Sequence, residues 1–348
     1  MTSIQGFTPL HAAILKLAHH QRLTAADAAE AFGVIMRGEA SALQVAAMLT
    51  GLRVSGEDAE VIAGVVSALR EVMVRLPSRD PHELVDTCGT GGGTVPTFNI
   101  STAAALLAAG AGVRIAKHGN RSFTSRCGSA DVLEALGISI EVPLATMAAA
   151  LEDAGIVFMY APLMHPAMRH VGAVRRELAI PTVMNVVGPL ANPAGARRQV
   201  VGVADANRVS VMAGALAELD AIHALVVHGE PGLDEISPLG YTRVVEIRDG
   251  ATTEWTIDPA DHGLLATDAG ELAGGSPATN ADVIREVLAN GASAGARAAV
   301  ILNAAAAIYV SGRVDSYKAG VEVARKALSE GLGLVALDRL REAYRSPA

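Results

Sequence analysis

The chain has 348 residues, of which 51% are hydrophobic and only 3% aromatic. This length predicts two domains or one large one, with an interior built mainly of Ala, Val, Leu and Ile. The formal net charge of −8 argues against non-specific nucleic-acid binding, which needs a basic surface. Two cysteines, Cys88 and Cys127, are too few for a disulfide framework or a structural zinc site.

No stretch of about 18 residues without charged or polar breaks predicts a membrane-spanning helix. The first residues lack a basic segment ahead of their apolar run, so the sequence predicts no signal peptide. The low cysteine content fits a reducing compartment. We therefore expect a cytoplasmic protein that binds neither nucleic acid nor membrane.

Residues 8 to about 75 carry helical patterns only. Four helices joined by short glycine-containing connections predict a small bundle. In the fourth helix, Glu57 is expected in the first turn. The predicted helix starts, each with a suitable cap residue or an N-terminal proline, are Thr8-Pro9, Thr24, Ser41 and Ser55.

Residues 76–84 are rich in proline and polar residues and predict a linker. Beyond them strand and helix patterns alternate, which predicts an α/β domain with a largely parallel central sheet. A helical tail from about 280 to 344 would cover one face of that sheet. The predicted strands lie near 84–87, 113–116, 138–140, 156–159, 199–203, 222–228, 242–247 and 252–256.

The most informative stretch runs from Asp86 to Gly137. A short apolar run ends in a glycine turn at 89–93, and an alanine-rich helix from about 102 to 111 follows. A second strand, predicted over 113–116, leads into a basic loop that begins at Lys117. Between the glycine turn and the helix lies a polar cluster of Thr97, Asn99, Ser101 and Thr102.

This order of elements predicts a phosphate site. Glycines let the backbone approach an anion closely, and a helix N-terminus offers free N–H groups and a positive dipole end. Ser101 and Thr102 can cap the helix or donate to phosphate oxygens, and Lys117 supplies a positive charge. No Gly-Lys-Ser/Thr closes the turn, so it is not a Walker A loop. The third glycine of the dinucleotide fingerprint is also missing.

Two further stretches carry candidate chemistry. Residues 165–176 place several basic side chains on a helix that is expected to start near Pro166, with Arg169 and Arg176 close to one face. Asp234 and Glu235 follow a buried strand in a Gly/Pro loop. A carboxylate pair of this kind is usually only solvated, but Mg²⁺ is typically held by one or two carboxylates with substrate oxygens and water.

Several separated motifs resemble the anthranilate phosphoribosyltransferase family. They are Gly-Thr-Gly-Gly at 89–92, Thr-Phe-Asn-Ile-Ser-Thr at 97–102, Lys-His-Gly-Asn-Arg-Ser at 117–122 and the helix pattern of 128–137. The resemblance extends in the same order over most of the chain. It implies transfer of a phosphoribosyl group from phosphoribosyl pyrophosphate to anthranilate in tryptophan biosynthesis, with Mg²⁺ as cofactor and a homodimer as assembly.

The resemblance also implies a fold of the nucleoside-phosphorylase and class IV phosphoribosyltransferase type. The small α-helical domain would comprise residues 1–76 together with about 166–192. The large α/β domain would comprise 77–165 and 193–348 and would bind phosphoribosyl pyrophosphate and Mg²⁺. Anthranilate would then lie between the two domains, a usual place for a ligand.

Site residues follow from the same resemblance, position by position. Those implied for phosphoribosyl pyrophosphate are Gly89, Thr90, Gly91, Gly92, Thr97, Asn99, Ser101, Thr102, Lys117 and Ser129. Those implied for anthranilate are Gly89, His118, Asn120, His165 and Arg175, with Arg175 meeting the carboxylate. The implied metal ligands are Ser101, Asp234 and Glu235. No residue is assigned as a general base.

One position departs from the family pattern, which usually has an acidic residue where this chain has Gly93. The spacing from Gly89 to Asn99 is retained, so the phosphate cradle is kept while a carboxylate near the pyrophosphate is lost. Two alternatives remain open at this point. One is an enzyme like pyrimidine nucleoside phosphorylase, and the other is a non-catalytic, nucleic-acid-binding relative with the same fold.

Overall fold

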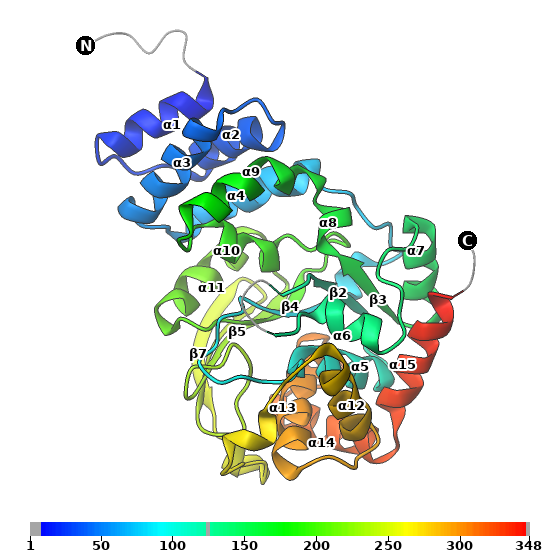
Figure 1. Cartoon of the computed structure of the whole chain (residues 1–348). Helices are drawn as coiled ribbons and strands as arrows, with labels where there is room; N and C mark the ends of the chain where they lie inside the picture. Colours follow the sequence, from blue (N-terminus) through cyan, green and yellow to red (C-terminus); the bar gives the residue numbers. More distant parts are fainter. Residues whose placement is uncertain (1–7, 123–125, 346–348) are drawn as a thin grey trace.

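The computed structural model describes residues 8–122 and 126–345. The chain begins with four helices, α1 (Pro9–Ala18), α2 (Ala25–Met36), α3 (Ala42–Ser55) and α4 (Ala59–Val72), which pack together at one end of the molecule (Figure 1). The predicted starts of the first three helices are confirmed, because the side chains of Thr8, Thr24 and Ser41 each accept a backbone hydrogen bond there.

The predicted start of the fourth helix is wrong. Ser55 is the last residue of α3, and Glu57 lies ahead of α4 rather than in its first turn. The cap is Asp58, whose carboxylate accepts from the backbone N–H of Val61 at 2.9 Å. Both Ser and Asp are good cap residues, so local preference alone could not separate the two positions.

Seven strands form one sheet within the described residues, in the order β3-β2-β1-β4-β5-β6-β7. The first five in that order are parallel, and β6 and β7 continue the sheet as antiparallel strands, so the prediction of a largely parallel sheet is confirmed. The strands are β1 (Val85–Gly89), β2 (Ile115–Gly119), β3 (Ile156–Tyr160), β4 (Arg198–Gly202), β5 (His223–Gly229), β6 (Thr242–Arg248) and β7 (Ala251–Ile257).

The strand predicted at 138–140 is wrong. Ile138 and Ile140 are buried and Ser139 is exposed, which gives the alternation typical of a strand, but these residues lie in the connection between α6 and α7 and pair with no strand. The two isoleucines anchor that connection in the core. Alternating burial does not require a strand, because a loop can also bury every second side chain.

Helices cover both faces of the sheet. On the side away from the N-terminal bundle lie α5 (Ile100–Gly110), α6 (Ser129–Ala135), α7 (Leu144–Asp153), α12 (Pro277–Leu288), α13 (Ala294–Val310), α14 (Tyr317–Ser329) and α15 (Leu332–Ala343), while α11 (Val209–Glu218) packs on α4 and on β5 (Figure 1). The predicted helical tail is therefore confirmed. None of the helices in the described part of the chain is long and apolar enough to cross a bilayer.

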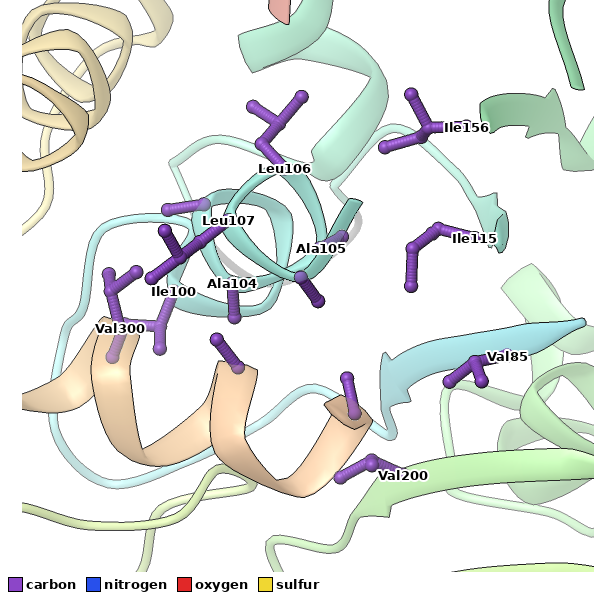
Figure 2. Close-up of a cluster of buried hydrophobic side chains, with 14 of the residues drawn as sticks. Val85, Ile100, Ala104, Ala105, Leu106, Leu107, Ile115, Ile156, Val200 and Val300 are labelled. Carbon is purple, nitrogen blue, oxygen red and sulfur yellow. The ribbon is translucent and has the colours of Figure 1, made fainter. Parts of the chain in front are cut away.

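Neighbouring residues of the strands point to two different hydrophobic cores. Val200 belongs to the core shared with α5 and α13, while Val201 belongs to the core shared with the N-terminal helices. Leu225 and Val226 divide in the same way. Figure 2 shows the first of these cores, in which Val85 and Val200 of the sheet lie near α5 and α13. The two faces of a parallel sheet are both buried here, as its apolar sequence requires.

The connection from β3 to β4 returns to the N-terminal bundle. It contains α8 (Ala161–Met164), α9 (Arg169–Leu178) and α10 (Met184–Val187), with short 3₁₀ turns at Pro166–Met168 and Gly188–Leu190. Helix α9 contacts α2 and α3, and Val171 and Val174 on its buried side join their core. This excursion places a basic helix from the middle of the chain beside helices from its beginning (Figure 1).

Candidate active site

The candidate residues gather at the carboxyl ends of the parallel strands, where ligands of open α/β sheets usually bind. Strand β1 ends at Gly89, β2 at Gly119 and β5 at Gly229, and each is followed by a loop that carries predicted site residues. Lys117 and His118 lie within β2, not in the loop after it, because β2 is shifted by two residues from the predicted strand. Their side chains are therefore held by the sheet.

Asp234 closes the glycine turn. The backbone N–H of Gly91 donates to its Oδ2 at 2.7 Å. A Cβ added at Gly89 would collide with the Asp234 carboxylate, and one at Gly202 would collide with its backbone carbonyl. Glycine is needed at both places because the Asp234 loop lies directly over the ends of β1 and β4.

The turn is tied down on its other side as well. The N–H of Thr90 donates to the carbonyl of Gly202 at 2.9 Å, and its hydroxyl accepts from the N–H of Ala204 at 3.2 Å. Gly91 and Gly92 both have positive φ, of 72° and 83°, and a Cβ at either would meet open space. The backbone of the turn is thus free of side chains on the side where an anion would approach.

Glu235 faces the start of α5. The N–H of Ser101 donates to its Oε1 at 3.1 Å, and Lys117 Nζ lies 3.4 Å from Ser101 Oγ and donates to the Thr87 carbonyl at 2.5 Å. Burial, and after it the neighbouring Asp234, raise the pKa of Glu235 to about 8. Burial also raises the pKa of Asp234 and lowers that of Lys117.

This acid pair suits a divalent cation whose remaining ligands come from a substrate and from water. The described residues contain no cluster of three or more His, Cys, Asp or Glu side chains that would enclose a metal ion alone. The raised pKa values of these two buried carboxylates show that too little positive charge lies near them to stabilise both negative charges. Lys117 lowers the pKa of Glu235 only in part. Mg²⁺ is commonly bound in this way, through one or two carboxylates.

Not every residue of the polar cluster faces the glycine turn. Asn99 donates to the carbonyl of Cys127 at 3.1 Å and accepts from Asn280 of α12 at 2.9 Å. Thr102 is only 1% exposed, and its hydroxyl has no hydrogen-bond partner in the part of the chain that the structure describes. It lies on the buried side of α5, next to a small internal space that Leu106 and Leu133 also line. The structure therefore brings Ser101, but not the Thr102 side chain, towards Glu235.

The loop after β2 is held against the start of α6. The hydroxyl of Ser129 donates to the carbonyl of Asn120 at 3.3 Å. A Cβ added at Gly119 would collide with the Ser129 hydroxyl. Arg121 is fixed by ion pairs with Asp131 and Glu134, at 2.9 and 2.6 Å. These contacts give the Lys-His-Gly-Asn-Arg motif a defined position at the end of the strand.

His118 and His165 face one another with ring centroids 4.9 Å apart. His165 follows α8, and residues 118 and 159 are direct neighbours in the β2–β3 ladder, which brings the two histidines together. Burial lowers the pKa of His118 to about 3 and that of His165 to about 4, so both rings are neutral at pH 7. Among the described residues, Nε2 of His118 and both nitrogens of His165 have no hydrogen bond of normal geometry, although the Gly188 backbone lies near His118 and the Ala191 backbone near His165.

Arg175 lies in the last turn of α9 and is half-buried, whereas Arg169 and Arg176 on the same helix are exposed. Burial lowers the pKa of the Arg175 guanidinium. Within the described residues, no carboxylate forms an ion pair with it. A half-buried guanidinium without an acidic partner suits an anionic ligand.

Two residues of the site were missed by the sequence analysis. Asp86 is fully buried in β1, where its carboxylate accepts from the backbone N–H of His118 at 3.3 Å and from Asn192 Nδ2 at 2.8 Å. Burial raises the pKa of Asp86 to about 6. Asn192 also donates to the carbonyl of Ala116 at 2.8 Å. The signal was present, because an aspartate inside an apolar strand must find buried partners.

The comparison with known proteins agrees with this geometry. Residues 11–73 match the model of the glycosyl transferase family helical bundle domain, and residues 81–334 match the model of its a/b domain. The anthranilate phosphoribosyltransferase of Rubrobacter xylanophilus is 49% identical over 330 residues, which cover 95% of this chain and 96% of that protein. The chain belongs to the anthranilate phosphoribosyltransferase family.

Solved structures of this family have the same fold. The anthranilate phosphoribosyltransferase of Thermus thermophilus superposes with a TM-score of 0.91 at 41% identity, covering 96% of this chain and 99% of that one. The Saccharomyces cerevisiae enzyme in complex with PRPP and Mg has a TM-score of 0.87 at 28% identity, covering 97% and 98%. The predicted family, fold and phosphoribosyltransferase activity are thereby confirmed.

Proposed function

We propose that this member of the anthranilate phosphoribosyltransferase family joins the phosphoribosyl group of phosphoribosyl pyrophosphate to the amine of anthranilate and releases pyrophosphate, in tryptophan biosynthesis. The observation that carries the proposal is the contact between three segments at the carboxyl end of the sheet. There the glycine turn and the N-terminus of α5 are hydrogen-bonded to the Asp234–Glu235 pair. Beside β1, His118 on the neighbouring strand β2 faces His165, which follows α8, and both rings are neutral.

In this proposal the phosphates and ribose bind the backbone of the turn and the surrounding polar groups. The glycine backbone of the turn would let the phosphates approach closely, the positive dipole end of α5 would favour their negative charge, and Lys117 would add positive charge. Asp234 and Glu235, with the Ser101 hydroxyl, would hold Mg²⁺. The bound metal would supply charge neutralisation for the pyrophosphate leaving group. The remaining candidates for this substrate are Gly89, Thr90, Gly91, Gly92, Thr97, Asn99, Thr102 and Ser129.

The structure of the yeast enzyme is described as a complex with PRPP and Mg, and a second yeast structure as a complex with 4-fluoroanthranilate. These complexes support the same two substrates and the same metal for this enzyme. Thr102 is the weakest of the candidates, since its buried hydroxyl would have to reach the ligand from the inner side of α5. Asn99 is also turned away from the glycine turn, towards Cys127 and Asn280, whereas Ser101 and Lys117 lie close to Glu235 and to one another.

Anthranilate would lie near the histidine pair and Asn120, with its carboxylate on Arg175. A guanidinium can pair with a carboxylate through two parallel hydrogen bonds, which fixes the plane of the ring. The buried, unpartnered nitrogens of His118 and His165 offer neutral hydrogen-bonding groups to the amine or carboxylate. Gly89, at the end of β1, is the remaining candidate for this substrate.

No general base is needed for the transfer. The bond between the ribose anomeric carbon and pyrophosphate breaks through an oxocarbenium-like transition state, and the amine nitrogen forms the new bond. An aryl amine is neutral at pH 7, and the ortho carboxylate of anthranilate can receive the proton that the amine loses. The protein would then act by positioning its substrates and by electrostatic stabilisation.

The test is a time course of anthranilate fluorescence with phosphoribosyl pyrophosphate and Mg²⁺ from micromolar to millimolar concentration. We expect loss of fluorescence only when all three components and the enzyme are present. Folded protein that causes no loss at any Mg²⁺ concentration would show that the acceptor is another compound.

Two further properties belong to the proposal. The enzyme is expected to act in the cytoplasm, a reducing compartment that fits the two free cysteines, Cys88 and Cys127. It is also expected to form a homodimer through the N-terminal helices, where Leu43 and Val54 of α3 are 84% and 79% exposed. Analytical ultracentrifugation with charged substitutions at these two positions would test the dimer.

The boundaries of the two domains remain part of the proposal as well. Residues 1–76 and about 166–192 would form the small helical domain, and 77–165 with 193–348 the large one. The packing of α9 against α2 and α3 supports the inclusion of the later segment in the small domain.

A further inference from the structure

Asn303 interrupts the apolar run Ala298–Ala307 in the middle of helix α13. It is only 3% exposed. Asparagine is a poor helix former, and its amide costs free energy when it is buried without partners. A residue of this kind in a packed alanine-rich helix therefore needs an explanation in its contacts.

Two of the three side-chain hydrogen bonds of Asn303 go to one residue, Ile236, in the loop after β5. Nδ2 of Asn303 donates to the carbonyl of Ile236 at 2.9 Å, and Oδ1 accepts from the N–H of the same residue at 2.9 Å. The second amide hydrogen reaches the carbonyl of Ala299 in its own helix, also at 2.9 Å. The side chain thus satisfies both backbone groups of Ile236, the residue that follows Glu235, in a two-point contact resembling a strand pair.

The same loop is held from a second helix. The N–H of Ser101 at the start of α5 donates to the Glu235 carboxylate at 3.1 Å. Helices α5 and α13 pack against one another, and Figure 2 shows Ala104 of α5 turned towards α13. Ser101, Glu235 and Asn303 also line one small pocket beneath the glycine turn. Two packed helices therefore hold Glu235. Helix α5 binds the Glu235 carboxylate, and α13 binds the backbone of the following residue, Ile236.

We propose that Asn303 is a positioning residue that holds the Asp234–Glu235 pair in the geometry required for a divalent cation. The proposal rests on the proposed function, in which that pair binds Mg²⁺. Asn303 itself is separated from the acids by the Ile236 backbone and acts only through it. Without the two hydrogen bonds to Ile236, the residue that follows Glu235 loses its polar link to α13, and the two carboxylates are held less rigidly.

The test measures metal binding directly, with Mn²⁺ as the probe. Free Mn²⁺ is followed by electron paramagnetic resonance in mixtures of enzyme and phosphoribosyl pyrophosphate without anthranilate, against the same mixtures without enzyme. Asn303→Leu keeps a similar volume and removes all three side-chain hydrogen bonds. We expect its Mn²⁺ dissociation constant to rise about tenfold or more, as when partners that orient metal ligands are removed. Asn303→Ser, which keeps one hydroxyl, should give a smaller rise.

Tyr309→Phe is the matched control for a buried hydrogen bond lost from the same helix. The Tyr309 hydroxyl donates to Glu246 at 2.8 Å, on β6 and away from the acid pair. This variant should lose stability and keep the Mn²⁺ affinity of the unmodified enzyme. A purely structural role for Asn303 would instead give the Leu and Phe variants the same Mn²⁺ affinity at comparable thermal stability.

Asp234→Asn tests the metal assignment separately from the role of Asn303. If it weakens Mn²⁺ binding and folded Asn303→Leu or Asn303→Ser does not, the role of Asn303 is wrong and the metal assignment stands. If Asp234→Asn leaves Mn²⁺ binding unchanged, the metal assignment itself is wrong and the role of Asn303 falls with it. If Asn303→Leu does not fold, the Ser variant decides between these outcomes.

Discussion

Gly93 lies directly opposite Asp234 across the glycine turn. A Cβ at this position would be 3.1 Å from the carbonyl of Gly232 and 3.4 Å from Oδ1 of Asp234. The family resemblance implies an acidic residue here, and the structure shows that its carboxylate would join the existing acid pair. In the proposed metal site, this chain would therefore offer a divalent cation one negative charge fewer.

Replacing Gly93 by Asp should lower the Mg²⁺ concentration required for half-maximal activity, by about threefold to tenfold, because affinity for hard cations rises with the charge of the ligand set. The Mg²⁺ dependence of the fluorescence assay measures this change. Gly93→Asn has nearly the same shape without the charge and is the control. Equal Mg²⁺ curves for the two variants would show that shape, not charge, matters at this position.

Arg175→Ala should raise the KM for anthranilate about 10- to 100-fold, since a lost hydrogen bond to a charged group costs about 1.5–3 kcal/mol. The KM for phosphoribosyl pyrophosphate should change little. Arg176→Ala is the matched control, because it removes the same charge from the neighbouring exposed position. Equal effects of Arg175→Ala on both KM values would contradict its assignment to the anthranilate carboxylate.

Asp86 gives the fold a pH dependence that can be isolated. Burial raises its pKa from 3.8 to about 6, so the native state holds its proton more tightly than the unfolded chain does. The contribution to stability is complete below pH 3.8 and is lost as the pH rises through 6. At pH 7 the loss amounts to about 3 kcal/mol, from two pKa units at 1.36 kcal/mol each.

Asp86→Asn removes this titration and keeps the shape of the side chain. Its free energy of unfolding, relative to that of the unmodified protein, should therefore increase between about pH 3 and pH 7 by about 3 kcal/mol. Urea unfolding at a series of pH values measures the difference. A difference that stays constant over this range would show that Asp86 is not the group responsible.

At the scale of elements, the fourth helix shows what local patterns can determine. The helix itself was evident from its apolar spacing, but its start was placed at Ser55 instead of Asp58. Asp58→Ala should lower the free energy of unfolding by about 1 kcal/mol, the usual value of an N-cap. Ser55→Ala should change it by less than about 0.5 kcal/mol, because Ser55 caps nothing. Denaturant unfolding of the two variants tests the assignment, and a larger loss from Ser55→Ala would reverse it.

Most elements of this fold could be read from the sequence because their signals are local. Caps, glycine turns and apolar runs located the helices and all of the observed strands, and separated motifs identified the family. The error at 138–140 arose because burial of Ile138 and Ile140 is decided by packing, not by strand pairing. Asp86 and Asn303 were missed for the same reason, since their partners lie far along the chain.

At the scale of the molecule, the N-terminal helices share their hydrophobic core with one face of the sheet. Phe32 of α2 lies in the same hydrophobic cluster as Val201 and Val226, which come from the side of the sheet facing the bundle. The opposite side of the same strands contributes Val200 and Leu225 to the other core. Because the strands contribute to both clusters, loss of packing in one core should also destabilise the other.

Phe32→Ala should destabilise the whole chain by about 3–5 kcal/mol, as expected for a large buried side chain. Trp255, the only tryptophan, lies on β7 and packs against the other core. Its fluorescence should shift with the same midpoint as the helical circular dichroism signal. Two separate midpoints, with only the circular dichroism affected, would show that the bundle unfolds on its own.

The return of α9 and α10 to the first four helices has a consequence for synthesis. These early helices leave the ribosome while their partners, beginning at Arg169, are still almost a hundred residues away. At about 5–20 residues per second this is a wait of roughly 5–20 s, during which the sides of α3 and α4 that later pack on α9 and α10 are uncovered. We therefore expect the nascent chain to bind chaperones that hold unfolded segments. Slower translation of residues 73–168 would prolong its exposure to aggregation.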